Sequence, residues 1–214
     1  IERFDEAVRA MIDRRREAPG DDLLSQLVTA RDENGVGLTE AELRATAGLV
    51  LAAGFETTVN LLGNGIALLH EHPAQLRRLQ ADPGLWSNAV DEVLRIDPPV
   101  LLTGRMVVQD TTFAGIEVPR GALVTTLLAG ANRDPEVFTD PHTFDVAREN
   151  AGDHVSFSSG RHYCLGAALA RMEGEVGLRA IFDAFPDLRV LQGAKRRETR
   201  ILRGYGVLPA RLGG

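Results

Sequence analysis

A long, almost uncharged stretch of apolar residues constrains this chain more than any other feature. Between residues 45 and 69 there is one charged side chain, Glu56. A capping-box pattern, Thr39 with Glu42, precedes the stretch and a proline ends it, so we expect one helix over residues 39–70. Such a helix is long enough to span a bilayer, but a charge at its middle would cost about 2.5–3.5 kcal/mol there. We therefore expect a buried helix at the centre of a large domain, not a membrane span.

Composition limits the class of protein. The chain has 214 residues, 24 basic and 30 acidic side chains, and a net charge of −6. That length can bury a sizeable core, and the acidic balance argues against a nucleic-acid partner. The single cysteine, Cys164, excludes an internal disulfide and any multi-cysteine zinc or iron–sulfur site. With no signal-peptide pattern in the sequence, we expect a cytoplasmic protein.

Hydrophobic periodicity predicts a chain of helices with a few short strands. Besides the long helix, helices are expected at residues 1–18, 23–28, 74–80, 85–96 and 165–185. Strands are expected at residues 106–108, 111–113, 189–191 and 201–202. Residues 129–160 show no regular pattern, and a long irregular loop of this kind is often functional.

The lone cysteine occupies a distinctive position. Cys164 directly precedes the last predicted helix, where the helix dipole and free N–H groups stabilise a thiolate. Arg161 and His162 act in the same direction, and Gly160 and Gly166 leave room for a flat, bulky group near the backbone. Such a sulfur is either a metal ligand or a nucleophile, whereas the alternative is a small buried hydrophobe.

Two polar patterns lie on predicted helices. Glu92 and Arg95 are three residues apart and so share one helix face. An ion pair between them would contribute little to stability if it were exposed. Glu56 and Thr57 place an acid and an alcohol in a buried segment, which is costly unless both groups are satisfied or used. The second pair therefore either bonds a neighbouring helix or lines a cavity to which protons are delivered.

In this order and spacing, the three features resemble the cytochrome P450 family of haem-thiolate monooxygenases. Residues 157–166, FSSGRHYCLG, resemble the family's haem-binding signature, except that Ser158 stands where glycine is usual. Residues 92–95, EVLR, match the Glu-x-x-Arg pattern of the helix beneath the haem. Residues 53–58, AGFETT, are similar to the oxygen-activating stretch of the long central helix. The resemblance extends through nearly all of the chain and is greatest to the soluble bacterial class.

The resemblance implies a fold and a domain organisation. We expect a mostly α-helical protein with small β elements. The central long helix, the haem-ligand loop and the following helix would belong to the C-terminal half of a cytochrome P450-like fold. Because members of the family are much longer than this chain, residues 1–214 would form the C-terminal part of a single domain whose N-terminal half is absent.

The resemblance also implies which residues hold the cofactor, haem b. Cys164 would be the proximal thiolate ligand of the haem iron, and Arg105 and His162 would bond the haem propionates. Three further signature residues would shape the contact with the haem: Phe157, Gly160 and Gly166.

Two other groups follow from the same resemblance. Glu92, Arg95 and Arg148 would form a buried network beneath the haem, with a structural role. Glu56 and Thr57 would steer protons to the dioxygen that is being reduced, and are therefore the expected catalytic residues.

The expected substrate pocket is apolar. The residues that fall at pocket-lining positions are Leu49, Ala52, Ala53, Leu101, Leu102, Ile201 and Leu202. These side chains are otherwise ordinary core residues. Their composition favours an apolar small molecule as substrate.

The implied activity is the insertion of one oxygen atom from O2 into that substrate, with electrons from a ferredoxin or flavoprotein. Arg161, Arg171 and Arg179 would favour an acidic electron donor near Cys164. Two alternatives remain: a truncated haem-binding or non-catalytic fragment without an assembled pocket, and a cysteine hydrolase that uses Cys164 with His162. No membrane or nucleic-acid partner is expected.

Overall fold

The computed structural model describes residues 2–213. They form two compact units, and the division between Glu56 and Thr57 falls inside one long helix, α3 (Glu40–Glu71). Helices make up most of the regular structure, and the strands of the described residues form only two-stranded sheets. The predicted fold class, mostly α with small β elements, is therefore confirmed.

The first unit contains α1 (Glu2–Glu17), α2 (Leu23–Thr29) and the first part of α3. Side-chain caps begin two of these helices, and the one at Thr39 is the capping box that the sequence predicts. Asp22 accepts the backbone N–H of Ser25 at 2.8 Å, and Thr39 and Glu42 exchange the two hydrogen bonds of a capping box. A small apolar core joins the three helices and consists of Val8, Ile12, Leu43, Leu24, Leu27, Val28 and Ala47.

The long apolar helix α3 is only partly buried. Its length and composition would allow it to cross a membrane, and only 11% of its most apolar window is buried. Leu49 and Phe55 are 67% and 76% exposed, whereas Leu61 is buried. Within the described residues of the first unit, α3 is covered only around Leu43 and Ala47, so the prediction of a helix buried along its whole length is not met there. The second half belongs to the second unit and meets the expectation; there the buried Asn64 donates to the main-chain oxygen of Asp97 at 2.9 Å.

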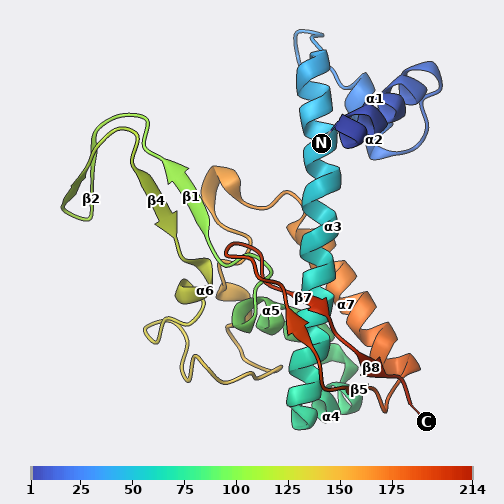
Figure 1. Ribbon diagram of the computed structural model, residues 1–214, viewed down its shortest axis with the longest axis vertical. Helices are drawn as coiled ribbons and strands as arrows, with labels where there is room; N and C mark the ends of the chain where they lie inside the picture. Colours follow the sequence, from blue (N-terminus) through green and yellow to red (C-terminus); the bar gives the residue numbers. More distant parts are fainter. Residues whose placement is uncertain (1, 214) are drawn as a thin grey trace. The chain divides into compact units, whose positions relative to one another are not determined.

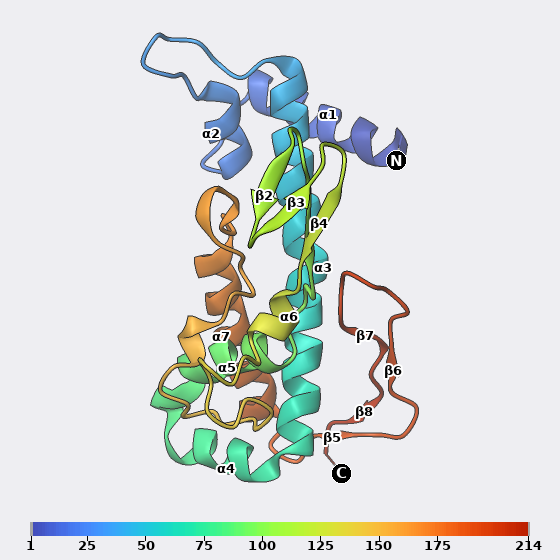
Figure 2. The same ribbon diagram turned by 90° about the vertical axis from the view of Figure 1, so that its left-hand side faces the viewer.

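In the second unit, α4 (Pro73–Ala81), α5 (Trp86–Ile96) and α7 (Ala167–Ala184) pack around the second half of α3, and α7 runs beside it in both views (Figures 1 and 2). Glycines let α3 and α7 approach closely. A Cβ on Gly65 would lie 2.7 Å from Leu178, and one on Gly177 would lie 2.8 Å from Leu62. The buried core of this unit includes Leu61, Leu69, Leu79, Trp86, Val90, Val93, Phe144, Val146, Leu178 and Phe182.

The first strands of the second unit form two short two-stranded sheets, the second at the far end of the first (Figure 2). β1 (Thr103–Met106) pairs antiparallel with β4 (Leu123–Thr126), and β2 (Thr111–Phe113) pairs with β3 (Ile116–Val118) between them. The strand predicted at residues 106–108 is therefore misplaced. The N–H of Val107 donates to the oxygen of Ala122, and the oxygen of Val107 accepts the N–H of Gly121, in the turn that precedes β4. The ladder between β1 and β4 therefore ends at Met106.

The last strands lie near the C-terminus. β5 (Arg189–Val190) pairs with β8 (Ala210–Arg211), and β6 (Lys195–Arg196) pairs with β7 (Tyr205–Val207). The strand predicted at residues 201–202 is wrong, since Leu202 forms only an isolated bridge with Val100.

The irregular region predicted at residues 129–160 contains only short helical turns. α6 (Leu128–Ala131) leads into it, and η2 (Ala151–Asp153) lies near its end. Two other short turns connect neighbouring elements: η1 (Pro83–Leu85) joins α4 to α5, and η3 (Gly160–His162) precedes α7.

Candidate functional site

The cysteine loop, residues 157–166, connects the irregular region to α7. A main-chain hydrogen bond of 2.9 Å from the N–H of Cys164 to the oxygen of Phe157 closes it. Two residues inside the loop have left-handed backbones, Ser158 with a φ of 62° and Gly160 with a φ of 63°. Glycine adopts this conformation without steric cost, so Ser158 is the strained position of the pair.

The thiol of Cys164 is free and exposed. A Cβ added to Gly160 or Gly166 would meet nothing within 4 Å, so the backbone beside the sulfur is open. Arg105, on β1, and His162, on η3, are also exposed. An accessible soft sulfur ligand, open backbone and side chains that donate hydrogen bonds suit the iron, the macrocycle and the propionates of haem, respectively. The residues present therefore fit the expected cofactor.

The structure gives no support to other uses of the cysteine. Among residues 2–213 there is no group of three His, Cys, Asp or Glu side chains that could hold a metal ion. In the same part of the chain, His162 makes no hydrogen bond to Cys164 or to a carboxylate. A cysteine hydrolase needs such a pair and an orienting third group, so this alternative loses its geometric basis.

The three residues predicted to form a network do lie together. Glu92 and Arg95 are fully buried and form a two-pronged ion pair, with distances of 2.7 Å and 2.8 Å. Arg148 donates to the same carboxylate at 3.2 Å, and the backbone N–H of Asp145 does so at 2.9 Å. Every oxygen of the buried carboxylate is therefore paired, which is the condition under which a buried charge is tolerated.

Arg95 also reaches across to the irregular region. Its guanidinium donates to the main-chain oxygens of Asn132, Pro141 and Thr143, at 2.8–3.0 Å. The same group lies 5.0 Å from the ring centroid of Phe138. Because these acceptors have no regular ladder to join, Arg95 supplies the donors that fix this loop onto α5.

A second network, which the sequence did not reveal, is centred on Asp91, the residue of α5 that directly precedes Glu92. Asp91 accepts from Arg171 at 2.7 Å and from His154 at 3.1 Å. Burial alone would raise the pKa of Asp91, but these two hydrogen bonds hold it below its ordinary value. Arg171 and His154 are distant from Asp91 in the sequence. The only sequence signal for this network is that Asp91 is a second acid beside Glu92.

The second network involves Arg171, whose predicted docking role stays a prediction. Its side chain is paired with Asp91 and lies over the ring of Phe157, 4.6 Å from the centroid, so it is not a free surface cation. Arg179 is paired with Asp183 at 3.5 Å on the same helix. Arg161 is exposed, as a docking residue would be.

The predicted catalytic pair falls at the division between the two units. Glu56 is the last residue of the first unit and Thr57 the first of the second, and both are half-buried. The neighbouring Thr58 donates to Glu173 of α7 at 3.0 Å. The predicted pocket residues Leu49, Ala52 and Ala53 are exposed on the first unit. That these three residues line the substrate pocket stays a prediction.

The other four predicted pocket residues are brought together in the second unit. The N–H of Leu101 donates to the oxygen of Ile201 at 2.8 Å, and the bridge between Val100 and Leu202 lies beside it. Leu101, Leu102 and Leu202 are half-buried, while Ile201 is 54% exposed. Two segments 100 residues apart therefore present apolar side chains at one place.

An ion-pair cluster holds these two segments. Asp97, which is 4% exposed, accepts from Arg196 at 2.6 Å and from Arg203 at 2.5 Å. Arg196 also donates to Asn64 of α3 at 2.8 Å. No sequence pattern indicated this cluster, because its members come from three separate parts of the chain.

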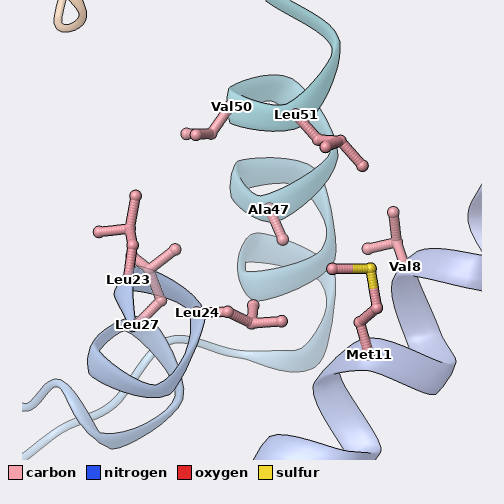
Figure 3. Close-up of a pocket in the computed structure, with 8 residues that line it drawn as sticks. All are labelled: Val8, Met11, Leu23, Leu24, Leu27, Ala47, Val50 and Leu51. Atoms are coloured by element: carbon pink, nitrogen blue, oxygen red, sulfur yellow. The ribbon is translucent and has the colours of Figure 1, made fainter. Parts of the chain in front are cut away.

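The first unit carries an apolar hollow of its own. Figure 3 shows side chains from α1, α2 and α3 converging on it. The lining residues are Val8, Met11, Leu23, Leu24, Leu27, Ala47, Val50 and Leu51. None of them is a predicted site residue, and the lining offers no polar group with which to orient a ligand.

Comparison with known proteins agrees with the geometry. The family model described as "Cytochrome P450" matches residues 1–82 and 85–203. Cytochrome P450 140 of Mycobacterium tuberculosis is 55% identical over 215 residues, which cover 100% of this chain and 49% of that protein. The 6-deoxyerythronolide B hydroxylase of Saccharopolyspora erythraea is 43% identical, over 95% of this chain and 51% of its own length.

A solved structure shows the same similarity. The cytochrome P450 PksS of Bacillus subtilis superposes with a TM-score of 0.94 at 37% identity, covering 100% of this chain and 55% of that one. The chain thus spans about half the length of the relatives it matches.

Proposed function

Because the chain belongs to the cytochrome P450 family, we propose that it carries the thiolate-ligand side of a haem-dependent monooxygenase. Members of this family bind haem b, and Cys164 is the residue of this chain suited to hold its iron. The observation that carries the proposal is the accessible sulfur of Cys164 on a closed loop flanked by open glycines. Arg105 and His162 would bind the propionates through charge-assisted hydrogen bonds.

The proposed reaction places one atom of O2 in a C–H bond of the substrate and releases the other as water, and it consumes two electrons and two protons. When bound, haem supplies the iron at which dioxygen is reduced, and a thiolate ligand favours cleavage of the O–O bond. The electrons would come from a ferredoxin or a flavoprotein, for which the exposed Arg161 offers a contact to an acidic surface.

Protons would reach the site through two side chains of α3. The carboxylate of Glu56 can take up a proton, and the hydroxyl of Thr57 can pass one on. If so, Thr57→Ala keeps haem binding but lets electrons be consumed without product. The ratio of product to electrons measures this coupling, and an unchanged ratio would remove Thr57 from the proton path.

The substrate would be an apolar small molecule. Leu101, Leu102, Ile201 and Leu202 present an apolar surface where two distant segments pair. One relative is a 6-deoxyerythronolide B hydroxylase, and the structural neighbour PksS belongs to polyketide biosynthesis. A bulky, polyketide-like substrate is therefore the first class to assay.

A reduced-plus-carbon-monoxide spectrum tests the cofactor assignment. Haem is added to the purified chain, and the red-shifted Soret band of a thiolate-ligated haem is expected. Cys164→Ser should lose that band while its far-ultraviolet circular dichroism stays that of the parent. A thiolate band in Cys164→Ser would show that Cys164 is not the ligand, and its absence from the parent would refute the proposal for this chain.

The exposure of the apolar first half of α3 favours a second candidate, a haem-binding fragment without an assembled substrate pocket. Leu49 and Phe55 are 67% and 76% exposed there. This candidate predicts a thiolate haem spectrum that no apolar substrate perturbs. A substrate-induced shift of the Soret band would favour the monooxygenase over this second candidate.

In either case we propose a soluble, cytoplasmic protein.

A further inference from the structure

Two consecutive carboxylates on α5 face different parts of the structure. Neighbouring residues of an α-helix point about 100° apart, so Asp91 and Glu92 cannot serve the same partner. Glu92 binds Arg95 and Arg148 and thereby holds the irregular region. Asp91 instead faces the N-terminal half of α7 and the segment that leads into the cysteine loop, through Arg171.

The Asp91 carboxylate is held by two donors in a mostly enclosed position. Arg171 Nε donates to Asp91 Oδ1 at 2.7 Å, and the two side chains are 30% and 18% exposed. His154, whose side chain is fully buried, has its Nε2 3.1 Å from the same oxygen. Because His154 Nδ1 accepts the backbone N–H of Ser156 at 3.2 Å, the network assigns the ring proton to Nε2. Both donors therefore point at Asp91.

Phe157 lies between the groups that Asp91 holds. The Arg171 guanidinium lies 4.6 Å from the centroid of its ring, and the His154 ring lies 5.6 Å away. Tyr163 approaches the same ring edge-on at 6.4 Å, and its hydroxyl lies 3.4 Å from Arg171. A guanidinium over an aromatic face is attracted by the ring quadrupole, so the position of Arg171 restrains the ring.

The main chain of Phe157 is in turn the acceptor for the ligand residue. Its oxygen receives the N–H of Cys164 at 2.9 Å. A contact path thus runs from the Asp91 carboxylate through Arg171 and Phe157 to the backbone of Cys164. Every step of the path is a hydrogen bond or a cation–π contact within the second unit.

We propose that Asp91 and Arg171 are positioning residues for the Cys164 sulfur. Asp91 sets the position of the Arg171 guanidinium, the guanidinium sets the Phe157 ring, and Phe157 sets the hydrogen bond that orders Cys164. The value of this order for iron ligation rests on the proposed haem function. The order itself is a property of the chain and can be measured without haem.

Amide hydrogen exchange at Cys164 in the full chain is the direct test. Arg171→Met removes both the charge and the planar face, and Asp91→Asn removes the charge with little change of shape. Each should speed exchange at the Cys164 amide about tenfold, equivalent to about 1.4 kcal/mol. The Asp145 amide, which is bonded to Glu92, should change less than twofold.

A matched control lies on the same helix. Arg179 is paired with Asp183 and does not touch the cysteine loop, so Arg179→Met should leave exchange at Cys164 unchanged. Circular dichroism of each variant shows that it is folded, and Arg171→Lys, which keeps the charge, serves if Arg171→Met does not fold. Exchange at Cys164 that stays within twofold of the parent in the folded Arg171 and Asp91 variants would overturn the proposal.

The haem-loaded protein separates this inference from the proposed function. If the parent shows the thiolate spectrum, Arg171→Met and Asp91→Asn should shift its reduction potential, and Arg179→Met should not. A parent without that spectrum refutes the haem function but leaves the exchange result standing. A thiolate spectrum with unchanged exchange and unchanged potential refutes the positioning role alone.

Discussion

At the scale of the residue, Ser158 occupies a backbone conformation that suits glycine. Its φ is 62°, in the left-handed region, where a Cβ costs roughly 1–2 kcal/mol. The residue lies six positions before Cys164, in the loop that the Phe157–Cys164 hydrogen bond closes. The strain is therefore local to the candidate site and is compatible with the closed loop.

Ser158→Gly should therefore stabilise the protein. The relief of the left-handed strain exceeds the extra chain entropy that glycine loses on folding, so we expect a gain of up to about 1 kcal/mol. Urea unfolding followed by circular dichroism measures it. Ser159→Gly is the matched control, because Ser159 has an extended backbone with a φ of −153° and glycine there should destabilise. A loss of stability in Ser158→Gly would show that the Ser158 side chain compensates for the strain.

The buried carboxylate of Glu92 pairs with two arginines that hold the irregular region, Arg95 and Arg148. Glu92→Gln keeps the shape but removes the charge that pairs with Arg95 and Arg148. A buried cation left without its partner costs about 3–5 kcal/mol. We expect a loss of this size in the free energy of unfolding, or an unfolded chain. Glu71→Gln, at an exposed position, is the control, and a loss below about 1 kcal/mol in Glu92→Gln would contradict the assignment.

At the scale of the element, the packing of α3 on α7 depends on glycine. A Cβ on Gly65 would lie 2.7 Å from Leu178, whose side chain is buried. Gly65→Ala should therefore destabilise the second unit by about 1–3 kcal/mol through overpacking. Thermal unfolding checks this. Gly54→Ala, on the same helix with nothing within 4 Å, should instead stabilise by up to about 1 kcal/mol, and equal effects at both positions would refute the packing argument.

Local patterns predicted the helices better than the strands. The capping box at Thr39 and the proline after Glu71 determine where α3 starts and ends, and both signals are local. β1 ends one residue after Arg105 because of its pairing with a distant strand. The segment around Leu202 makes a single bridge instead of a ladder. Strand bounds follow from partners that a periodic pattern does not identify.

At the scale of the whole molecule, motifs predicted contacts around the candidate site only where the spacing between residues was short. Glu92 and Arg95 share a helix face, and their contact follows from that spacing. The family resemblance, and no spacing in the sequence, predicted that Arg148 belongs with them, and in the structure Arg148 pairs with Glu92. The contacts of Asp91 and Asp97 depend on chain segments far away in sequence. Burial of a carboxylate is a consequence of packing, so composition alone could not have revealed either cluster.

Carboxylates with lowered pKa values occur in both units. In the first unit, the backbone N–H of Ser25 lowers the pKa of Asp22, and hydrogen bonds from Thr39 lower that of Glu42. In the second unit, burial would raise the pKa of Asp145, but hydrogen bonds, including one from Arg78, hold it below its ordinary value. The pKa of Asp91 is also lowered, by Arg171 and His154 against the effect of burial.

Stability should therefore fall in acid. A carboxyl whose pKa is lower in the folded chain binds more protons when the chain is unfolded. Its contribution to the free energy of unfolding is therefore complete above the unfolded pKa of about 4 and is lost as the pH drops through the folded pKa. Urea midpoints between pH 7 and pH 3 measure this loss. Asp22→Asn with Glu42→Gln retains good capping residues but removes two of the titrating groups. The double variant should resemble the parent at pH 7 and lose less stability towards pH 3, and identical acid limbs would show that these two carboxylates titrate alike in the folded and unfolded chain.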